Sequence, residues 1–171
     1  VLDVQNGDIL AMVSHPTFAV SGGKTQADPA YAPMMNKATT AFAPGSIFKV
    51  FTALAALNEG VISDETSFYC PGFFDYGGRR FKCFKHSGHG DLSLRDAISQ
   101  SCDVYFYQTA LLLGLDNIAH YARDMFGIGE RTGVDLPEAA GQVPTERWYR
   151  RHHQSGLVPG FAINTSVGQG D

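Results

Sequence analysis

The sequence predicts an α+β domain in which helices flank an antiparallel sheet. Residues 1–13 have the pattern of a β-hairpin around a tight Asn6-Gly7 turn. The middle of the chain carries apolar runs of helical length, and residues 164–170 read as a strand or turn. Strands at both ends with helices between them are typical of α+β domains, so we expect segments outside this chain to complete the sheet.

Two stretches at the start of the chain differ sharply in composition. Residues 14–40 contain repeated Gly and Pro, and we expect them to be mostly irregular. Residues 50–57 are apolar on nearly every face, which is typical of a helix buried in a core. Gly60 follows this run and predicts the end of the helix.

Helical signals return in the second half. Ser93 and Asp96 form a variant of the capping box that predicts a helix start, and the apolar run 104–113 follows. A further helix is predicted from Asp116, as its cap, to Phe126. The many Gly and Pro residues over 127–159 favour loops and short strands.

Composition and charge exclude several classes of function. The chain has 171 residues and 44% hydrophobic content, enough for a core of ordinary size. The net charge of −4, without a basic block, gives no support for nucleic-acid binding. No apolar run reaches transmembrane length. A local basic cluster at 147–153 is interpreted as an exposed helix.

Ser46 and Lys49 form a candidate nucleophile and base at the entrance to the apolar helix. Residues three apart lie on one face of a helix, so the amine of Lys49 can reach the Ser46 hydroxyl. A serine beside a proton acceptor is an activated nucleophile. The alternative is that Ser46 is only a helix cap, and the pattern itself recurs at Ser21 and Lys24 in a Gly-rich stretch.

A second polar pair, Ser101 and Asp103, brackets a single residue just before an apolar run. A short non-helical turn at this point would direct both side chains into the same cleft. We therefore include both residues in the candidate active site.

The three cysteines and a histidine suggest a metal centre. Cys70, Cys83 and Cys102, together with one imidazole, would complete a closed tetrahedral zinc site. The intervening stretch, residues 71–80, looks like a hairpin too small to have a core of its own. Either His86 or His89 has a suitable spacing for the fourth ligand. The competing interpretations are a Cys70–Cys83 disulfide that leaves Cys102 free, and three unligated cysteines.

Taken together, these motifs resemble the transpeptidase domain of class B penicillin-binding proteins, in particular the elongation-type subgroup called penicillin-binding protein 2. The resemblance rests on the opening hairpin, on Pro-Gly-Ser46-x-x-Lys49, on Ser101-x-Asp103, and on the Gly-Gln-Gly segment 168–170. Most of the superfamily has Asn at the third position of the second motif, whereas the elongation-type subgroup resembles this chain in having Asp.

The resemblance implies a penicillin-binding/serine β-lactamase-like fold. Residues 1–171 would form the N-terminal and central part of the domain, with a Cys/His-rich excursion at about 68–102. The family continues into a strand that bears a Lys-Thr-Gly motif, which this chain lacks. We therefore expect residues 1–171 alone to be inactive. The Lys of that motif would offset the negative charge that Asp103 brings next to Lys49.

The implied activity is a peptidoglycan D,D-transpeptidase that acts during cell elongation. Ser46 would form an acyl-enzyme with D-Ala-D-Ala stem peptides, and Lys49 would take the Ser46 proton. Ser101 would relay a proton to the leaving amine, while Asp103 would hold Lys49 and the substrate amide. β-Lactams would acylate Ser46 by mimicking the donor. The rivals are a related serine β-lactamase or D,D-carboxypeptidase, and a non-catalytic, zinc-stapled docking module of a cell-wall assembly complex.

The resemblance also implies a zinc ion, partners and a location. It favours His89 over His86, so that Cys70, Cys83, His89 and Cys102 would hold a structural zinc. The full protein would work with a RodA-type glycosyltransferase and other elongation-complex proteins. It would lie at the periplasmic face of the bacterial inner membrane.

Overall fold

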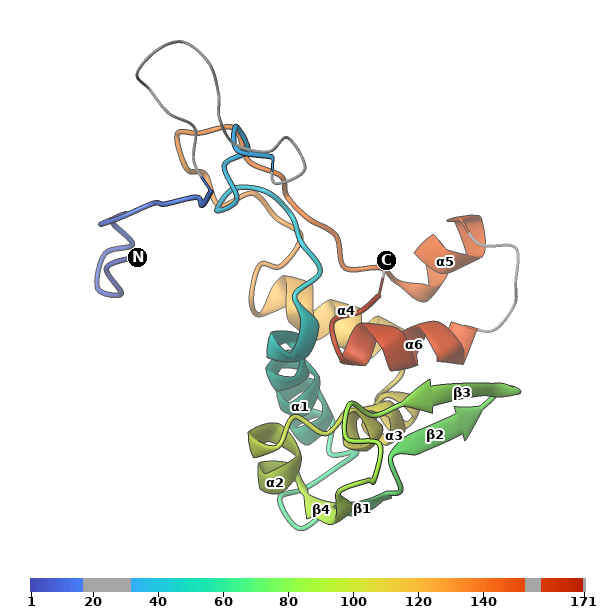
Figure 1. Ribbon diagram of the computed structural model, residues 1–171. Coiled ribbons are helices and arrows are strands. Elements are labelled where there is room, and N and C mark those ends of the chain that lie inside the picture. Colours follow the sequence, from blue (N-terminus) through green and yellow to red (C-terminus); the bar gives the residue numbers. More distant parts are fainter. Residues whose placement is uncertain (17–31, 153–157, 171) are drawn as a thin grey trace. The chain divides into compact units, whose positions relative to one another are not determined.

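The computed structural model describes residues 1–16, 32–152 and 158–170, and the chain divides into two compact units. The first unit comprises Val1–Phe42 and Arg131–Gly141, and the second comprises Ala43–Glu130 and Gln142–Asp171 (Figure 1). The second unit contains all the helices and strands that the structure assigns in the described residues.

The first unit contains the turn predicted at the start of the chain. Gly7 has a φ of +82° and donates from its backbone N–H to the Asp3 carbonyl at 2.8 Å. Only one antiparallel bridge follows, between Leu2 and Ile9. The two arms of the predicted hairpin do pair, since the Asp3 N–H donates to the Asp8 carbonyl at 2.8 Å and the Leu10 N–H to the Val1 carbonyl at 3.0 Å, but no extended strand is assigned in them. An isolated two-stranded ribbon is marginal without a neighbouring strand or helix to cover it.

The helices of the second unit surround α3 (Asp103–Leu113). Tyr105, Phe106 and Ala110 of α3 are completely buried. The helix packs against α1, α4 and α6. The other helices are α1 (Lys49–Asn58), preceded by the 3₁₀ turn η2 (Gly45–Phe48), α2 (Leu94–Ser99), α4 (Leu115–Asp124), α5 (Glu146–His152) and α6 (Val158–Ser166).

Four short strands form the excursion between α1 and α2. Strand β1 (Ser67–Cys70) pairs antiparallel with β4 (Gly90–Ser93), and β2 (Phe73–Tyr76) pairs antiparallel with β3 (Arg79–Lys82). The β2–β3 hairpin that the sequence predicted is confirmed, and Phe81 on its inner face packs against Tyr107 of α3. Helices with antiparallel strands confirm the α+β class.

Several element boundaries correct the sequence-based expectations. Helix α2 begins as predicted, because Ser93 Oγ accepts from the Asp96 N–H at 3.3 Å. Helix α4 begins one residue earlier than predicted, at Leu115, and Asp116 does not cap it. The Asp116 carboxylate instead accepts from the Glu146 backbone N–H at 2.8 Å, which connects the start of α4 to the start of α5.

The last part of the chain is more helical than its sequence suggested. No strand occurs in the described residues between 127 and 159, and α5 forms there instead. Residues 164–166 belong to α6 rather than to a strand. The reason is tertiary: Ala162, Ile163 and Ser166 lie at helical spacing and are buried, and α6 packs against α3 and α4.

The predicted exposed basic helix is confirmed as α5 for the part that the structure describes. Arg147, Arg150, Arg151 and His152 are exposed, and His153 lies outside the described residues. None of the helices in the described ranges combines the length and the apolar character needed to cross a membrane.

Candidate active site and metal centre

Ser46 lies in η2, which leads without a break into α1. Its side chain is exposed, whereas Phe48 and Lys49, which follow it, are buried. Gly45 before it has a φ of +61°, a conformation that glycine adopts without steric cost. The chain therefore presents one hydroxyl to solvent at the start of a core helix, a rigid position for a nucleophile.

A second glycine holds this turn in place. The Gly45 N–H donates to the Gly168 carbonyl at 3.0 Å. A Cβ added to Gly168 would lie 2.2 Å from the Gly45 carbonyl oxygen, so only glycine fits. One turn into α1, the Thr52 hydroxyl donates to the Ser166 carbonyl at 2.9 Å. The end of α6 and the residues after it thus hold the turn that carries Ser46, which we call the nucleophile turn. The sequence pattern did not predict this contact.

Lys49 extends from α1 to the N-terminus of α3. Its Nζ lies 2.8 Å from the Ser101 carbonyl oxygen, 2.9 Å from Ser101 Oγ and 2.7 Å from Asp103 Oδ1. The Lys49 residue is only 2% exposed, so these three contacts occupy a buried amine. Ser101 Oγ in turn donates to Ser46 Oγ at 2.9 Å.

The four predicted active-site residues therefore come together, but in a different order from the one expected. Among the described residues, no hydrogen bond joins Ser46 directly to Lys49; Ser101 stands between them. The amine turns toward α3 because Ser101 and Asp103 supply three acceptors there, which a buried ammonium requires.

The turn that carries Ser101 is strained. Ser101 has a φ of +52°, in the left-handed region that non-glycine residues rarely adopt. Helix α2 ends at Ser99 and α3 begins at Asp103, so the predicted non-helical turn is present. Positive φ at a non-glycine residue costs free energy and is found preferentially at functional sites.

Asp103 has a second partner that the sequence did not indicate. The Phe84 backbone N–H donates to Asp103 Oδ2 at 3.1 Å, while Oδ1 contacts Lys49. The Asp103 side chain is 14% exposed. Phe84 directly follows Cys83, but a backbone donor leaves no signal in residue type, so only the folded chain reveals this contact.

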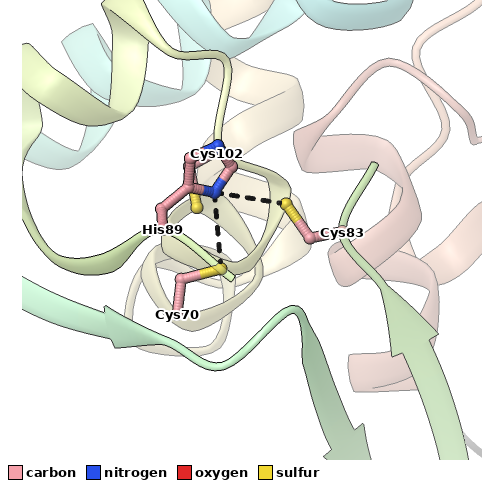
Figure 2. A group of neighbouring side chains, drawn as sticks. All are labelled: Cys70, Cys83, His89 and Cys102. Atoms are coloured by element: carbon pink, nitrogen blue, oxygen red, sulfur yellow. Dashed lines mark hydrogen bonds between the residues drawn. The ribbon is translucent and has the colours of Figure 1, made fainter. Parts of the chain in front are cut away.

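The cysteine and histidine side chains converge beside this site. Figure 2 shows Cys70, Cys83, His89 and Cys102 grouped around a common centre. Their ligand atoms all lie within 4.8 Å of one another, and Nδ1 of His89 lies 3.6 Å from both Cys70 Sγ and Cys83 Sγ. The three thiols are buried and free, so the competing disulfide between Cys70 and Cys83 does not form.

This geometry fits a tetrahedral metal ion. Zinc binds sulfur at about 2.3 Å and nitrogen at about 2.0 Å, so neighbouring sulfur and nitrogen ligands lie roughly 3.5 Å apart. The observed separations of 3.6 Å are close to that value. His86 is exposed and does not belong to the group, so His89 is the imidazole that completes it.

The protonation of the cluster suits metal binding. Desolvation lowers the pKa of His89, with a further contribution from the nearby positive charge of Lys85. The lowered pKa favours the neutral imidazole, the form that binds metal. Burial raises the pKa of the Cys102 thiol, so a metal ion has to displace its proton.

The exposed serine in a 3₁₀ turn, the buried lysine and the Ser-x-Asp turn before α3 are the arrangement expected from the resemblance to penicillin-binding transpeptidase domains. The family model described as the penicillin binding protein transpeptidase domain matches residues 1–170, and the chain belongs to this family. Within it, the chain is similar to the peptidoglycan D,D-transpeptidase MrdA of Haemophilus influenzae, with 34% identity over 99% of this chain and 28% of the relative.

Two further proteins are similar to this chain. MrdA of Acinetobacter baumannii is 36% identical over 99% of this chain and 27% of its own length. The solved structure of PBP2 from Helicobacter pylori covers 85% of this chain at 35% identity with a TM-score of 0.76, and 28% of that structure is matched. The chain thus spans less than a third of the length of these relatives.

Proposed function

We propose that the protein containing this chain is a peptidoglycan D,D-transpeptidase of the elongation type, with Ser46 as its nucleophile. The observation that carries the proposal is the continuous hydrogen-bonded path from Ser46 through Ser101 to Lys49, with Asp103 at its end. A serine hydroxyl with a proton path to a buried amine is the arrangement that acyl transfer requires.

The first step is attack by Ser46 Oγ on the carbonyl carbon between the two terminal D-alanines of a stem peptide. The hydrogen bonds in the structure run from Lys49 through Ser101 to Ser46. In the reactive form Lys49 is neutral and both hydroxyls are rotated to donate in the opposite direction. As the new bond forms, the Ser46 proton then moves to Ser101 Oγ and the Ser101 proton moves to Lys49. The Ser46 backbone N–H, at the start of the helical segment, stabilises the negative charge that develops on the carbonyl oxygen. Asp103 holds the amine in line while the proton moves.

The tetrahedral intermediate then breaks down. The C–N bond cleaves, Lys49 returns its proton through Ser101 to the departing amine, and D-alanine leaves the acyl-enzyme. The amine of a second stem peptide attacks the ester carbonyl, loses its proton to the same path and restores Ser46. A β-lactam follows the first step, but its leaving amine stays tethered and blocks the second.

The Cys70, Cys83, His89 and Cys102 cluster holds zinc in this proposal. Four protein ligands leave no open position, so the ion would be structural. It would supply folding free energy to a strand excursion that has little core of its own.

Two solved relatives support the partners that we propose. One solved H. pylori relative is a complex of PBP2 with MreC, with 34% identity and a TM-score of 0.76. Another, at 32% identity, is a peptidoglycan synthase complex in which polymerization and crosslinking are coordinated. We propose comparable elongation-complex partners here, including a RodA-type glycosyltransferase, with the domain at the periplasmic face of the inner membrane.

Labelling of the intact protein with a fluorescent penicillin tests the function, with mass spectrometry to locate the adduct. We expect one stable adduct on Ser46. Rapid loss of the label would identify a β-lactamase instead. No label at all on correctly folded protein would contradict the catalytic role and favour a docking module.

A further inference from the structure

The Asp103 carboxylate is bonded from two opposite directions. Oδ1 receives the Lys49 amine at 2.7 Å, and Oδ2 receives the Phe84 backbone N–H at 3.1 Å. Lys49 belongs to the proton path, whereas Phe84 is covalently next to Cys83 in the metal cluster. One side chain therefore joins the nucleophile machinery to the metal centre.

We propose that Asp103 is a mechanical link between the metal centre and the nucleophile, and that the Phe84 N–H makes a carboxylate necessary at this position. Phe84 is then a positioning residue, acting through Asp103. The consequence for acylation rests on the proposed function above, whereas the link between Asp103 and the metal loop (residues 83–89) does not.

The argument depends on the number of acceptors. A backbone N–H and an ammonium group are donors only, and an ionised carboxylate accepts at both oxygens. An asparagine at position 103 would offer one acceptor and one NH₂ donor, so it could satisfy only one of the two groups. The Lys49 contact is shorter and charge-assisted, so we expect the amide oxygen to turn toward Lys49. The NH₂ group would then face the Phe84 N–H. Both groups are donors, so no hydrogen bond could form between them.

The covalent connections strengthen the link. Cys83 precedes Phe84 and Cys102 precedes Asp103, so both partners of the hydrogen bond are attached to metal ligands. A bound ion would draw the two cysteines together and close a ring that includes this bond. The Phe84 ring is 62% exposed but packs edge-on against His89, with ring centroids 5.4 Å apart. Metal binding and the orientation of Asp103 are therefore coupled, and the coupling is reciprocal.

The test uses Asp103→Asn in the intact protein and measures zinc affinity by competition with a chromophoric chelator. We expect zinc affinity to fall by about tenfold, the lower end for loss of an outer-shell partner. We also expect the Phe84 amide to exchange its hydrogen several-fold faster. Ser46→Ala is the matched control, because it removes a group of the same proton path that does not touch the metal loop. It should leave both quantities unchanged.

A double-mutant cycle separates the hydrogen bond from the simple loss of negative charge near the ion. Phe84→Pro removes the N–H, so adding Asp103→Asn to it should cause no further loss of zinc affinity. A loss that persists in the Phe84→Pro background would overturn the role of Phe84. Unchanged zinc affinity and unchanged Phe84 exchange in Asp103→Asn alone would also overturn it, whether or not Ser46 reacts with penicillin.

Discussion

Ser101 Oγ lies 2.9 Å from Ser46 Oγ and donates a hydrogen bond to it, although 55 positions separate the two residues. This contact places a hydroxyl between the nucleophile and the buried amine of Lys49. In the proposed mechanism, Ser101 would relay the proton between Ser46 and Lys49, so it would be as necessary as Lys49 for activation. Five predictions follow from this arrangement and from the elements that hold it.

Ser46→Ala should abolish covalent penicillin labelling of the intact protein while leaving its melting temperature within a few degrees of the parent. The substitution removes one exposed hydroxyl and the hydrogen bond that it accepts from Ser101, a loss of roughly 1 kcal/mol. The control is Ser21→Ala, at the other Ser-x-x-Lys match, which lies outside the described residues. Adducts that survive in Ser46→Ala would rule out this nucleophile.

Ser101→Ala should slow acylation by about 10² to 10⁴, the usual range for loss of a general acid–base group. Ser101→Gly removes the same hydroxyl but relieves the backbone at φ +52°. We therefore expect Ser101→Gly to be acylated as slowly as Ser101→Ala. Its folded state should be more stable than that of Ser101→Ala by about 1 kcal/mol. Stopped-flow acylation and chemical denaturation measure the two effects. A fast Ser101→Gly variant would show that backbone shape, not the hydroxyl, carries the effect.

Gly168→Ala should lower both stability and acylation rate, because its Cβ would lie 2.2 Å from the Gly45 carbonyl oxygen and push the nucleophile turn away. Gly60→Ala is the matched control. Gly60 has a φ of +67° against +69° at Gly168, but no atom lies within 4 Å of its added Cβ. Both variants should be destabilised by placing a Cβ at positive φ, but only Gly168→Ala should slow acylation. Equal acylation rates in the two variants would refute the supporting role.

Cys70→Ser and Cys102→Ser should each reduce bound zinc, lower the melting temperature and slow acylation. Cys102 lies between Ser101 and Asp103, so its loss acts directly on the turn. Cys70 lies in β1, so in the proposed zinc site it would act on the turn through the shared ion. Elemental analysis of protein purified without added metal, followed by chelation, provides the measurement. If no stoichiometric zinc is found, or if the acylation rate is unchanged after chelation, the cluster does not control acylation through a metal ion.

Zinc affinity should fall as the pH is lowered from about 8 to about 6. Burial raises the pKa of Cys102, so its thiol is protonated before metal binds, and binding releases that proton. Lower pH opposes the release. Desolvation lowers the pKa of His89, so His89 contributes less to this dependence than an ordinary imidazole would. Chelator competition at several pH values gives the slope. An affinity independent of pH would contradict the release of a proton from Cys102 on binding.

The sequence by itself determined the parts that depend on local spacing. Ser46 and Lys49 stand three residues apart at a helix start, and Ser101 and Asp103 bracket one residue, so their types and positions were readable directly. The set of three cysteines with one histidine was readable as well. So was the β2–β3 hairpin, because the Gly77-Gly78 pair marks its turn.

Only the tertiary structure decided how these parts connect. The packing of α1 against α3 inserts Ser101 between Ser46 and Lys49, and the metal loop brings the Phe84 amide to Asp103. Residues 164–166 became helical because burial against α3 and α4 outweighs local preference. Hydrogen bonds between backbone groups, and contacts across fifty residues, depend on which faces pack together. No spacing rule encodes that choice, since it is fixed by the shape and volume of the whole core.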